Sequence, residues 1–242
     1  MSRANEARGP VHLRLQTAYR SRRLKRFLAN QVVPGESAFD IGANRGEWTA
    51  ALRSLTSEVV AVEPQAECAA ELEAKFGRDP GVKIVSSAVA EEVGTGGLHR
   101  TTTSSEHASM SEEWVHASGA LRVPADKWLD PIEVPVTTLD KLIEEHGIPG
   151  FCKVDVEGLE PEVFRGLGVP LHSVAFEFHH EMLDAVKRCV ERLEQLGRYS
   201  YGVYLDEWPD RLATDLGPER LADEIATLPP DSWGMVTARL EQ

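Results

Sequence analysis

The sequence has little cysteine. Only three of its 242 residues are cysteines, at positions 68, 152 and 189, and no Cys-x-x-Cys pair occurs. An odd number of widely spaced cysteines does not suit a disulfide framework or a cysteine-ligated zinc site. A chain of this length buries enough surface to fold without such cross-links. We therefore predict reduced thiols and a cytoplasmic protein.

Long apolar runs are also missing. The longest is Val59-Val60-Ala61-Val62, whereas a membrane-spanning helix needs about 20 apolar residues in sequence. The arginine-containing N-terminus lacks the apolar stretch that follows the basic residues of a secretory signal. We expect neither a membrane span nor a signal peptide.

Positive charge is scarce outside the first 30 residues. The chain has 26 basic and 39 acidic residues, a net charge of −13, yet residues 1–30 hold eight basic residues and only one acidic residue. That segment carries +7, so the remainder carries −20. A body this acidic does not suit nucleic acid, whose binding proteins neutralise phosphates with basic side chains.

The basic segment, residues 1–34, is predicted to be a helical extension of a single domain over residues 35–242. In the simplest interpretation it is a solvated helix that packs on the domain through its apolar residues, Leu13, Leu24, Phe27 and Leu28. The alternatives are contact with a membrane surface, with an anionic substrate, or with the acidic body of a second subunit in a homodimer.

Short apolar segments alternate with segments of helical periodicity, which predicts an α/β fold with helices on both faces of a mostly parallel sheet. Residues 94–119 are rich in Gly, Ser and Thr, and we expect a mobile loop there. Seven strands are expected, at 37–41, 58–62, 82–89, 151–156, 173–178, 199–205 and 233–240. Helices are expected at 47–55, 66–76, 139–146, from about 161, at 181–196 and at 218–228.

Four carboxylates stand at the ends of the first, second, fourth and fifth expected strands: Asp40, Glu63, Asp155 and Glu177. Ligands of open α/β sheets bind in the crevice at the carboxyl ends of the strands. We therefore expect these four side chains to converge on one crevice.

The turn after the first strand reads Asp-x-Gly-x-Asn-x-Gly over residues 40–46. A dinucleotide site would need Gly-x-Gly-x-x-Gly to receive pyrophosphate, and here an anion would meet Asp40. A nucleoside with a positive centre and no phosphate fits better. Glu63, which follows 23 residues later, suits the hydroxyls of a ribose. S-adenosylmethionine has a ribose, an adenine and a sulfonium cation.

With these residues the sequence resembles the FkbM-type methyltransferases, a class I family that uses S-adenosylmethionine. The resemblance runs from about residue 37 to 180, and its most distinctive part is Lys153-Val154-Asp155-Val156-Glu157-Gly158 followed by Glu160. It implies a Rossmann-like fold in which the strands at 199–205 and 233–240 are antiparallel. The expected cofactor-binding residues are Asp40, Gly42, Asn44, Gly46, Glu63, Pro64 and Ala88.

Two sequence motifs that are missing indicate which kind of atom receives the methyl group. No (Asp/Asn)-Pro-Pro-(Tyr/Phe) tetrapeptide is present to hold a nitrogen, and no cysteine nucleophile lies near the expected crevice. We therefore expect O-methylation of a carbohydrate or other natural-product hydroxyl. Four tryptophans outside the family segments could include one that stacks on a sugar ring: Trp114, Trp128, Trp208 and Trp233.

A hydroxyl needs a base or a metal ion to lose its proton. The candidates for the base are Asp155, Glu157, His179 and His180, and the simpler alternative for the two histidines is a solvated pair at a strand end. Mg²⁺ or Mn²⁺ could instead bind Asp155, Glu177 and His179. His107 and His116 would reach the substrate if their loop closes as a lid. A catalytically silent binding module is the competing function, although crowded acids favour catalysis.

Overall fold

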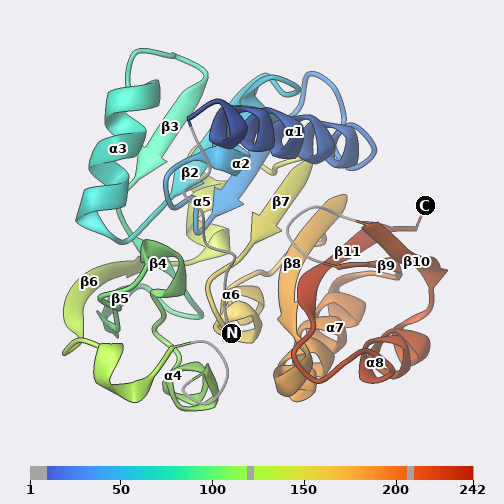
Figure 1. Ribbon diagram of the computed structural model, residues 1–242. Helices are drawn as coiled ribbons and strands as arrows, with labels where there is room; N and C mark the ends of the chain where they lie inside the picture. Colours follow the sequence, from blue (N-terminus) through green and yellow to red (C-terminus); the bar gives the residue numbers. More distant parts are fainter. Residues whose placement is uncertain (1–9, 119–122, 206–209, 242) are drawn as a thin grey trace.

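Eight strands form the central sheet, in the order β10-β9-β11-β8-β7-β1-β2-β3 (Figure 1). The computed structural model describes residues 10–118, 123–205 and 210–241. The strands are β1 (Ser37–Ile41), β2 (Glu58–Val62), β3 (Val82–Val85), β7 (Phe151–Val154), β8 (Ser173–His179), β9 (Tyr199–Leu205), β10 (Asp210–Leu216) and β11 (Trp233–Leu240).

Five neighbouring strands, from β3 to β8, run parallel, whereas β11 is antiparallel to both β8 and β9. The sheet is thus mostly parallel, and the predicted Rossmann-like α/β fold is confirmed. β9 and β11 are antiparallel to each other, as expected. One detail of the prediction was wrong, because β10 adds an eighth strand to the sheet. β10 was missed because it is a polar edge strand whose pairing with β9 contains register shifts.

A second, smaller sheet has the order β4-β6-β5 and consists of β4 (Ala88–Val89), β6 (Ile132–Thr137) and β5 (Gly94–Leu98). The single strand predicted over 82–89 is therefore two strands in different sheets. The predicted loop over 94–119 was also wrong, because it contains β5, η1 (Ser105–His107) and α4 (Glu112–Ser118). The glycines of β5 hide the apolar alternation that would indicate a strand.

Helices cover both faces of the central sheet, as expected (Figure 1). They are α2 (Glu47–Arg53), α3 (Ala66–Phe76), α5 (Leu139–His146), α6 (Glu160–Arg165), α7 (Leu183–Leu196), which follows η3 (His180–Met182), and α8 (Pro218–Ala226). Thr138 is the N-cap of α5, since its hydroxyl accepts a hydrogen bond from the Lys141 N–H at 3.0 Å.

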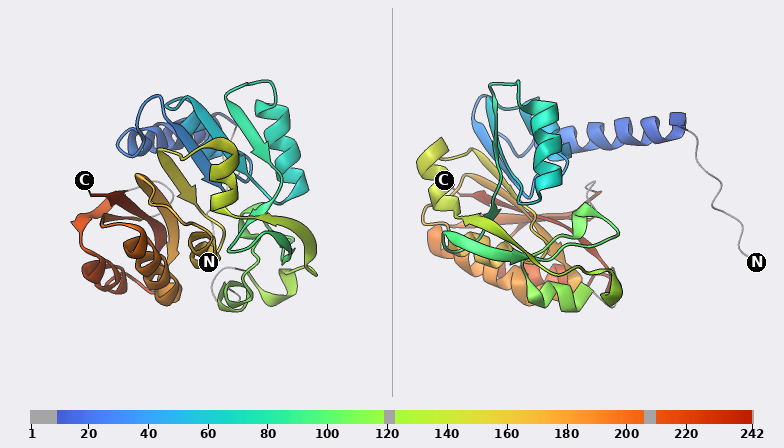
Figure 2. Two further views of the ribbon diagram at one scale, coloured as in Figure 1. Left: turned by 180° about the vertical axis from the view of Figure 1, so that it is seen from behind. Right: turned by 90° about the vertical axis from the view of Figure 1, so that its left-hand side faces the viewer.

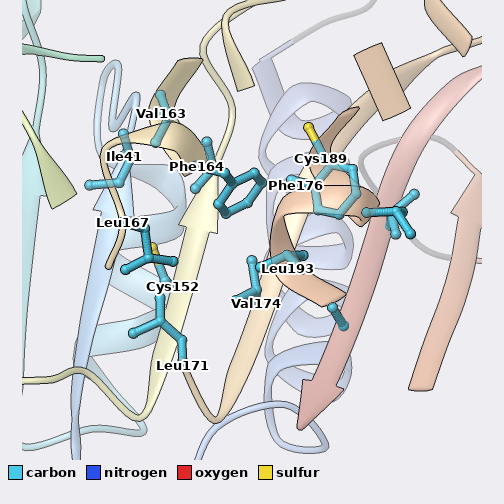
Figure 3. Close-up of a cluster of buried hydrophobic side chains, with 14 of the residues drawn as sticks. Ile41, Cys152, Val163, Phe164, Leu167, Leu171, Val174, Phe176, Cys189 and Leu193 are labelled. Carbon is cyan, nitrogen blue, oxygen red and sulfur yellow. The ribbon is translucent and has the colours of Figure 1, made fainter. Parts of the chain in front are cut away.

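The larger core lies between the sheet and helices α5 to α8. Phe176 of β8 packs edge to face against Phe164 of α6 with 5.5 Å between ring centroids (Figure 3). The opposite face of the sheet packs on α1 and α2 through Ala38, Phe151 and Ala175. Side chains of successive strand residues alternate between these two cores, so that Asp40, Lys153, Glu177 and His179 belong to the α2 side.

Helix α1 (Pro10–Leu28) projects from the body, and only its C-terminal end lies against the domain (Figure 2). Leu24, Phe27 and Leu28 are buried there, which confirms the packing expected for these residues. The side chain of Leu13 lies outside the described residues. Phe27 packs edge to face on Trp48, with ring centroids 5.9 Å apart.

The three cysteines are all free and buried, in agreement with the expected reduced thiols. Within the described ranges, no helix combines the length and the apolar character that crossing a membrane requires.

Candidate active site

A cavity of about 330 Å³ opens at the carboxyl ends of β1, β2, β7 and β8. Its volume is within the range of small-molecule and cofactor sites, roughly 300–1,000 Å³. The turn after β1 and the end of β2 form one part of its wall. The ends of β7 and β8 form a second part, and residues 105–108, which lie between β5 and β6 in the chain, form a third. Parallel strands bring these segments together, as the sequence predicted.

Gly42 begins the turn after β1 and has a left-handed φ of 75°. A Cβ atom at this position would lie 1.9 Å from the backbone oxygen of Asp155, so only glycine allows the turn to lie against the end of β7. Gly46 also has a positive φ, of 83°, but a Cβ there would meet Leu72 and Phe76 of α3. Gly46 is absent from the cavity wall, where we expected it.

Glu63 fixes the turn to the end of β2. Its two carboxylate oxygens accept hydrogen bonds from the backbone N–H groups of Asn44 and Gln65, each at 2.8 Å. The side chain is only 2% exposed. Burial raises the pKa of Glu63, while the two backbone donors lower it. Glu63 lines the cavity, so its oxygens can also accept hydrogen bonds from a ligand.

Asp40 was expected to contact the cofactor, but it lies beneath the site and is absent from the cavity wall. Its carboxylate accepts a 2.6 Å hydrogen bond from the Thr49 hydroxyl and lies 3.4 Å from the Lys153 Nζ. Asp40 and Lys153 are register neighbours on β1 and β7, which explains this pairing.

The buried side chain of Lys153 connects the turn after β1 with two carboxylates. Its Nζ donates to the Gly42 carbonyl at 2.7 Å and lies 3.3 Å from the carboxylate of Asp155 and 3.4 Å from that of Asp40. Burial by itself would lower the pKa of Lys153, but the two carboxylates outweigh it and the pKa is raised. The contacts of Lys153 are thus with the turn after β1 and with two carboxylates, which makes it a cation that holds the site together.

Asp155, Glu157, Glu177 and His179 converge on the cavity from β7 and β8. The Nε2 of His179 lies 3.0 Å from Glu177 and 3.8 Å from Glu157. Burial raises the pKa of Glu177 well above its usual range, and the neighbouring carboxylates of Asp155 and Glu160 raise it further. Trp114 stacks on the His179 ring with 4.1 Å between centroids and limits its orientation.

Glu160 holds the loop that carries Glu157, a role that we did not predict for it. Its Oε1 accepts hydrogen bonds from the backbone N–H groups of Val156 at 3.0 Å and Gly158 at 3.3 Å. Glu157 and Gly158 both have positive φ, so the loop needs this support. Burial raises the pKa of Glu160 to about 7, even though the backbone donors lower it.

Residues 105–109, which lie between β5 and β6 in the chain, close one side of the cavity. Ser105 lies 3.1 Å from the side-chain oxygen of Asn44, and its backbone oxygen accepts a hydrogen bond from Gln65 at 2.9 Å. The Ser109 hydroxyl donates to the Glu157 carbonyl at 2.6 Å. His107 lines the cavity, whereas His116 is exposed and lies outside it.

Most of the predicted site residues lie where the sequence placed them. His180 does not, because η3 turns it away from the cavity wall. Trp233 lines the cavity and Trp114 is buried behind it, whereas Trp128 is absent from the wall and Trp208 lies outside the described residues. The predicted residues on the wall are Gly42, Asn44, Glu63, Pro64, Ala88, Asp155, Glu157, Glu177 and His179.

The expected metal ligands were Asp155, Glu177 and His179, but the structure groups a different set. One donor atom each of Glu157, Glu177 and His179 lies within 4.8 Å of the others. Asp155 is held by Lys153 instead.

Residues 40–212 match the model of the methyltransferase FkbM domain. The chain belongs to this methyltransferase family. The match contains the turn after β1, the ends of β2, β7 and β8, and the insertion over the cavity. No curated protein matches the chain.

Several solved structures are similar in arrangement. The methyltransferase FkbM from Methylobacillus flagellatus KT has 16% identity and a TM-score of 0.47, and the match covers 93% of this chain and 54% of that one. The chain thus spans about half of that relative. Precorrin-6y C5,15-methyltransferase from Geobacter metallireducens GS-15 has 12% identity, a TM-score of 0.45 and coverage of 93% and 87%. The Bacillus cereus O-methyltransferase in complex with SAH has 13% identity, a TM-score of 0.44 and coverage of 98% and 84%.

Proposed function

We propose that this protein transfers the methyl group of S-adenosylmethionine to a hydroxyl of a carbohydrate or other natural-product acceptor. The observation that carries the proposal is the layout of one cavity. Its first part holds the turn after β1 and Glu63, and its second part holds the carboxylates and the histidine of β7 and β8. A cofactor in the first part would present its methyl group to an acceptor in the second.

In this proposal Glu63 binds the ribose hydroxyls, while Gly42 and Asn44 allow the backbone to approach the cofactor. Pro64 and Ala88 contribute apolar surface for the adenine. The six acidic side chains of the wall outnumber its two Lys and Arg residues, which favours a cationic sulfonium over a phosphate.

The reaction is an in-line displacement. The acceptor oxygen donates an electron pair to the methyl carbon, the carbon–sulfur bond breaks, and its electrons remain on sulfur as a neutral thioether. The oxygen loses its proton to a base, for which Glu157 and His179 are the best placed, with Asp155 beside them. Such a transfer requires an approach of about 3–3.5 Å between oxygen and carbon.

Calorimetry with S-adenosylmethionine tests the cofactor assignment, and absence of binding at millimolar concentration would reject it. A screen of oligosaccharides and polyketides for uptake of labelled methyl tests the acceptor assignment. Cofactor binding without transfer to any hydroxyl acceptor would instead support the catalytically silent binding module.

A homodimer is proposed on charge complementarity. The exposed basic side chains of α1 include Arg20, Arg22, Lys25 and Arg26, and the rest of the chain is strongly acidic. Sedimentation velocity tests this: a dimer held by these charges would dissociate as salt is raised, because screening weakens exposed ion pairs.

A further inference from the structure

We propose that Glu157, Glu177 and His179 form a binding site for a divalent cation, with Mn²⁺ or Mg²⁺ as its occupant. The site lies inside the cavity of the proposed methyl transfer, and its role in that reaction rests on the proposed function. The binding of the ion itself does not.

The first support is geometric. Three donor atoms, one from each side chain, lie within 4.8 Å of one another. Atoms this close can all lie within about 2.8 Å of one point, and small side-chain movements reach the roughly 2.0–2.6 Å of oxygen-ligated divalent ions. The three side chains line the cavity, so the remaining positions of the ion would face its interior.

The second support is the state of Glu177. Glu177 is only 7% exposed, and its Oε2 atom lies 3.0 Å from the Nε2 atom of His179. Within the part of the chain that the structure describes, this buried oxygen accepts no hydrogen bond. A buried carboxylate oxygen without a hydrogen bond is costly unless a cation satisfies it.

The third support is the negative charge gathered around one imidazole. The carboxylates of Glu157 and Glu177 lie 3.8 Å and 3.0 Å from the Nε2 atom of His179. The Nζ of Lys153, by contrast, lies within 3.4 Å of Asp40 and Asp155. A divalent ion would neutralise both carboxylates at once.

The donor set indicates which ion is suitable. Two carboxylates and one imidazole, without sulfur, suit Mg²⁺ or Mn²⁺ better than a thiolate-bound metal. The packing of Trp114 on the His179 ring restrains this ligand before the ion arrives. If the ion binds an acceptor hydroxyl at an open position, it also lowers the pKa of that hydroxyl.

The test is titration of the full chain with Mn²⁺, followed by electron paramagnetic resonance, without cofactor or acceptor. We expect saturable one-to-one binding that Mg²⁺ displaces. Glu157→Gln, Glu177→Gln and His179→Gln should each weaken it by about tenfold or more, since loss of a partner that merely orients a ligand weakens metal binding by roughly 10–100-fold. Glu106→Gln is the matched control, because Glu106 lines the same cavity outside the trio and its loss should have a much smaller effect.

Three results would overturn the proposal: no saturable binding at millimolar Mn²⁺, equal binding by Glu177→Gln and Glu106→Gln, or loss of binding in Asp155→Asn but not in Glu157→Gln. If a variant does not fold, paramagnetic broadening of the His179 ring signals in the unmodified protein decides the question. Because no cofactor is present, failure here leaves the S-adenosylmethionine titration unaffected, and the two proposals fail separately.

Discussion

Glu63 accepts a hydrogen bond from the backbone N–H of Asn44, which lies 19 residues earlier in the chain and 2.8 Å away. This bond connects the end of β2 to the turn after β1, and Gln65 occupies the other oxygen of the same carboxylate. One buried side chain thus shapes the turn and faces the cavity.

Replacement of Glu63 by Ala should weaken S-adenosylmethionine binding by about 1–3 kcal/mol, because it removes hydrogen bonds to the ribose and leaves two backbone N–H groups without their acceptor. Calorimetry measures the change. Glu67→Ala, an exposed acid on the neighbouring helix, is the control and should bind normally. Undiminished affinity of Glu63→Ala would remove its assigned role.

Replacement of Gly42 by Ala should destabilise the protein by at least about 3 kcal/mol, since the added Cβ would meet the Asp155 backbone and the residue would also keep a positive φ. The variant Gly35→Ala separates the cost of the close contact from the cost of the positive φ. Gly35 has a φ of 88° but no atom within 4 Å of an added Cβ, so only about 1–2 kcal/mol is expected. Urea denaturation compares them, and equal losses would contradict the close-contact argument.

Replacement of Lys153 by Met should destabilise the fold by about 3–5 kcal/mol, because Asp40 stays buried without its cation. The double variant Asp40→Asn/Lys153→Met should recover part of this loss, since the uncompensated charge is gone. A double-mutant cycle from denaturation curves measures the coupling. Additive losses would show that the pair does not interact.

Glu160 should make stability depend on pH. Its pKa is about 7 in the folded protein against a usual 4.5, so the folded state keeps a proton that the unfolded chain releases between these values. Stability should therefore fall as pH rises from about 4.5 to 7, by about 3 kcal/mol relative to Glu160→Gln. Glutamine keeps an acceptor for the two loop N–H groups but cannot ionise. Parallel pH profiles for the two proteins would contradict the raised pKa.

Much of the site followed from the sequence because strand ends are local features. Apolar runs such as Val59–Val62 reveal a strand, and the alternation with helices makes the sheet parallel, so Glu63, Asp155 and Glu177 had to meet at one edge. The glycines of the first turn are likewise visible in the sequence.

Strand-end position does not show where a side chain points or what it contacts. Asp40 lies one residue before the end of β1, yet it faces Thr49 and Lys153 beneath the cavity. Glu157, rather than Asp155, joins Glu177 and His179 because its loop turns through a left-handed residue held by Glu160. That arrangement depends on hydrogen bonds between residues that no periodicity relates.

The sequence by itself determined the fold class, the positions of most strands along the chain and the edge at which the polar residues gather, because hydrophobic periodicity and the handedness of crossovers act along the chain. Only the tertiary structure decided that 94–98 forms a strand and that Ser105 and His107 lie at the cavity. It also decided that Glu157 and Glu177 lie beside His179, whereas Asp40 and Asp155 lie beside Lys153. These depend on contacts between segments far apart in the chain, such as Arg45 with Ser105, which are 60 residues apart. The free energy of such contacts belongs to the packed molecule.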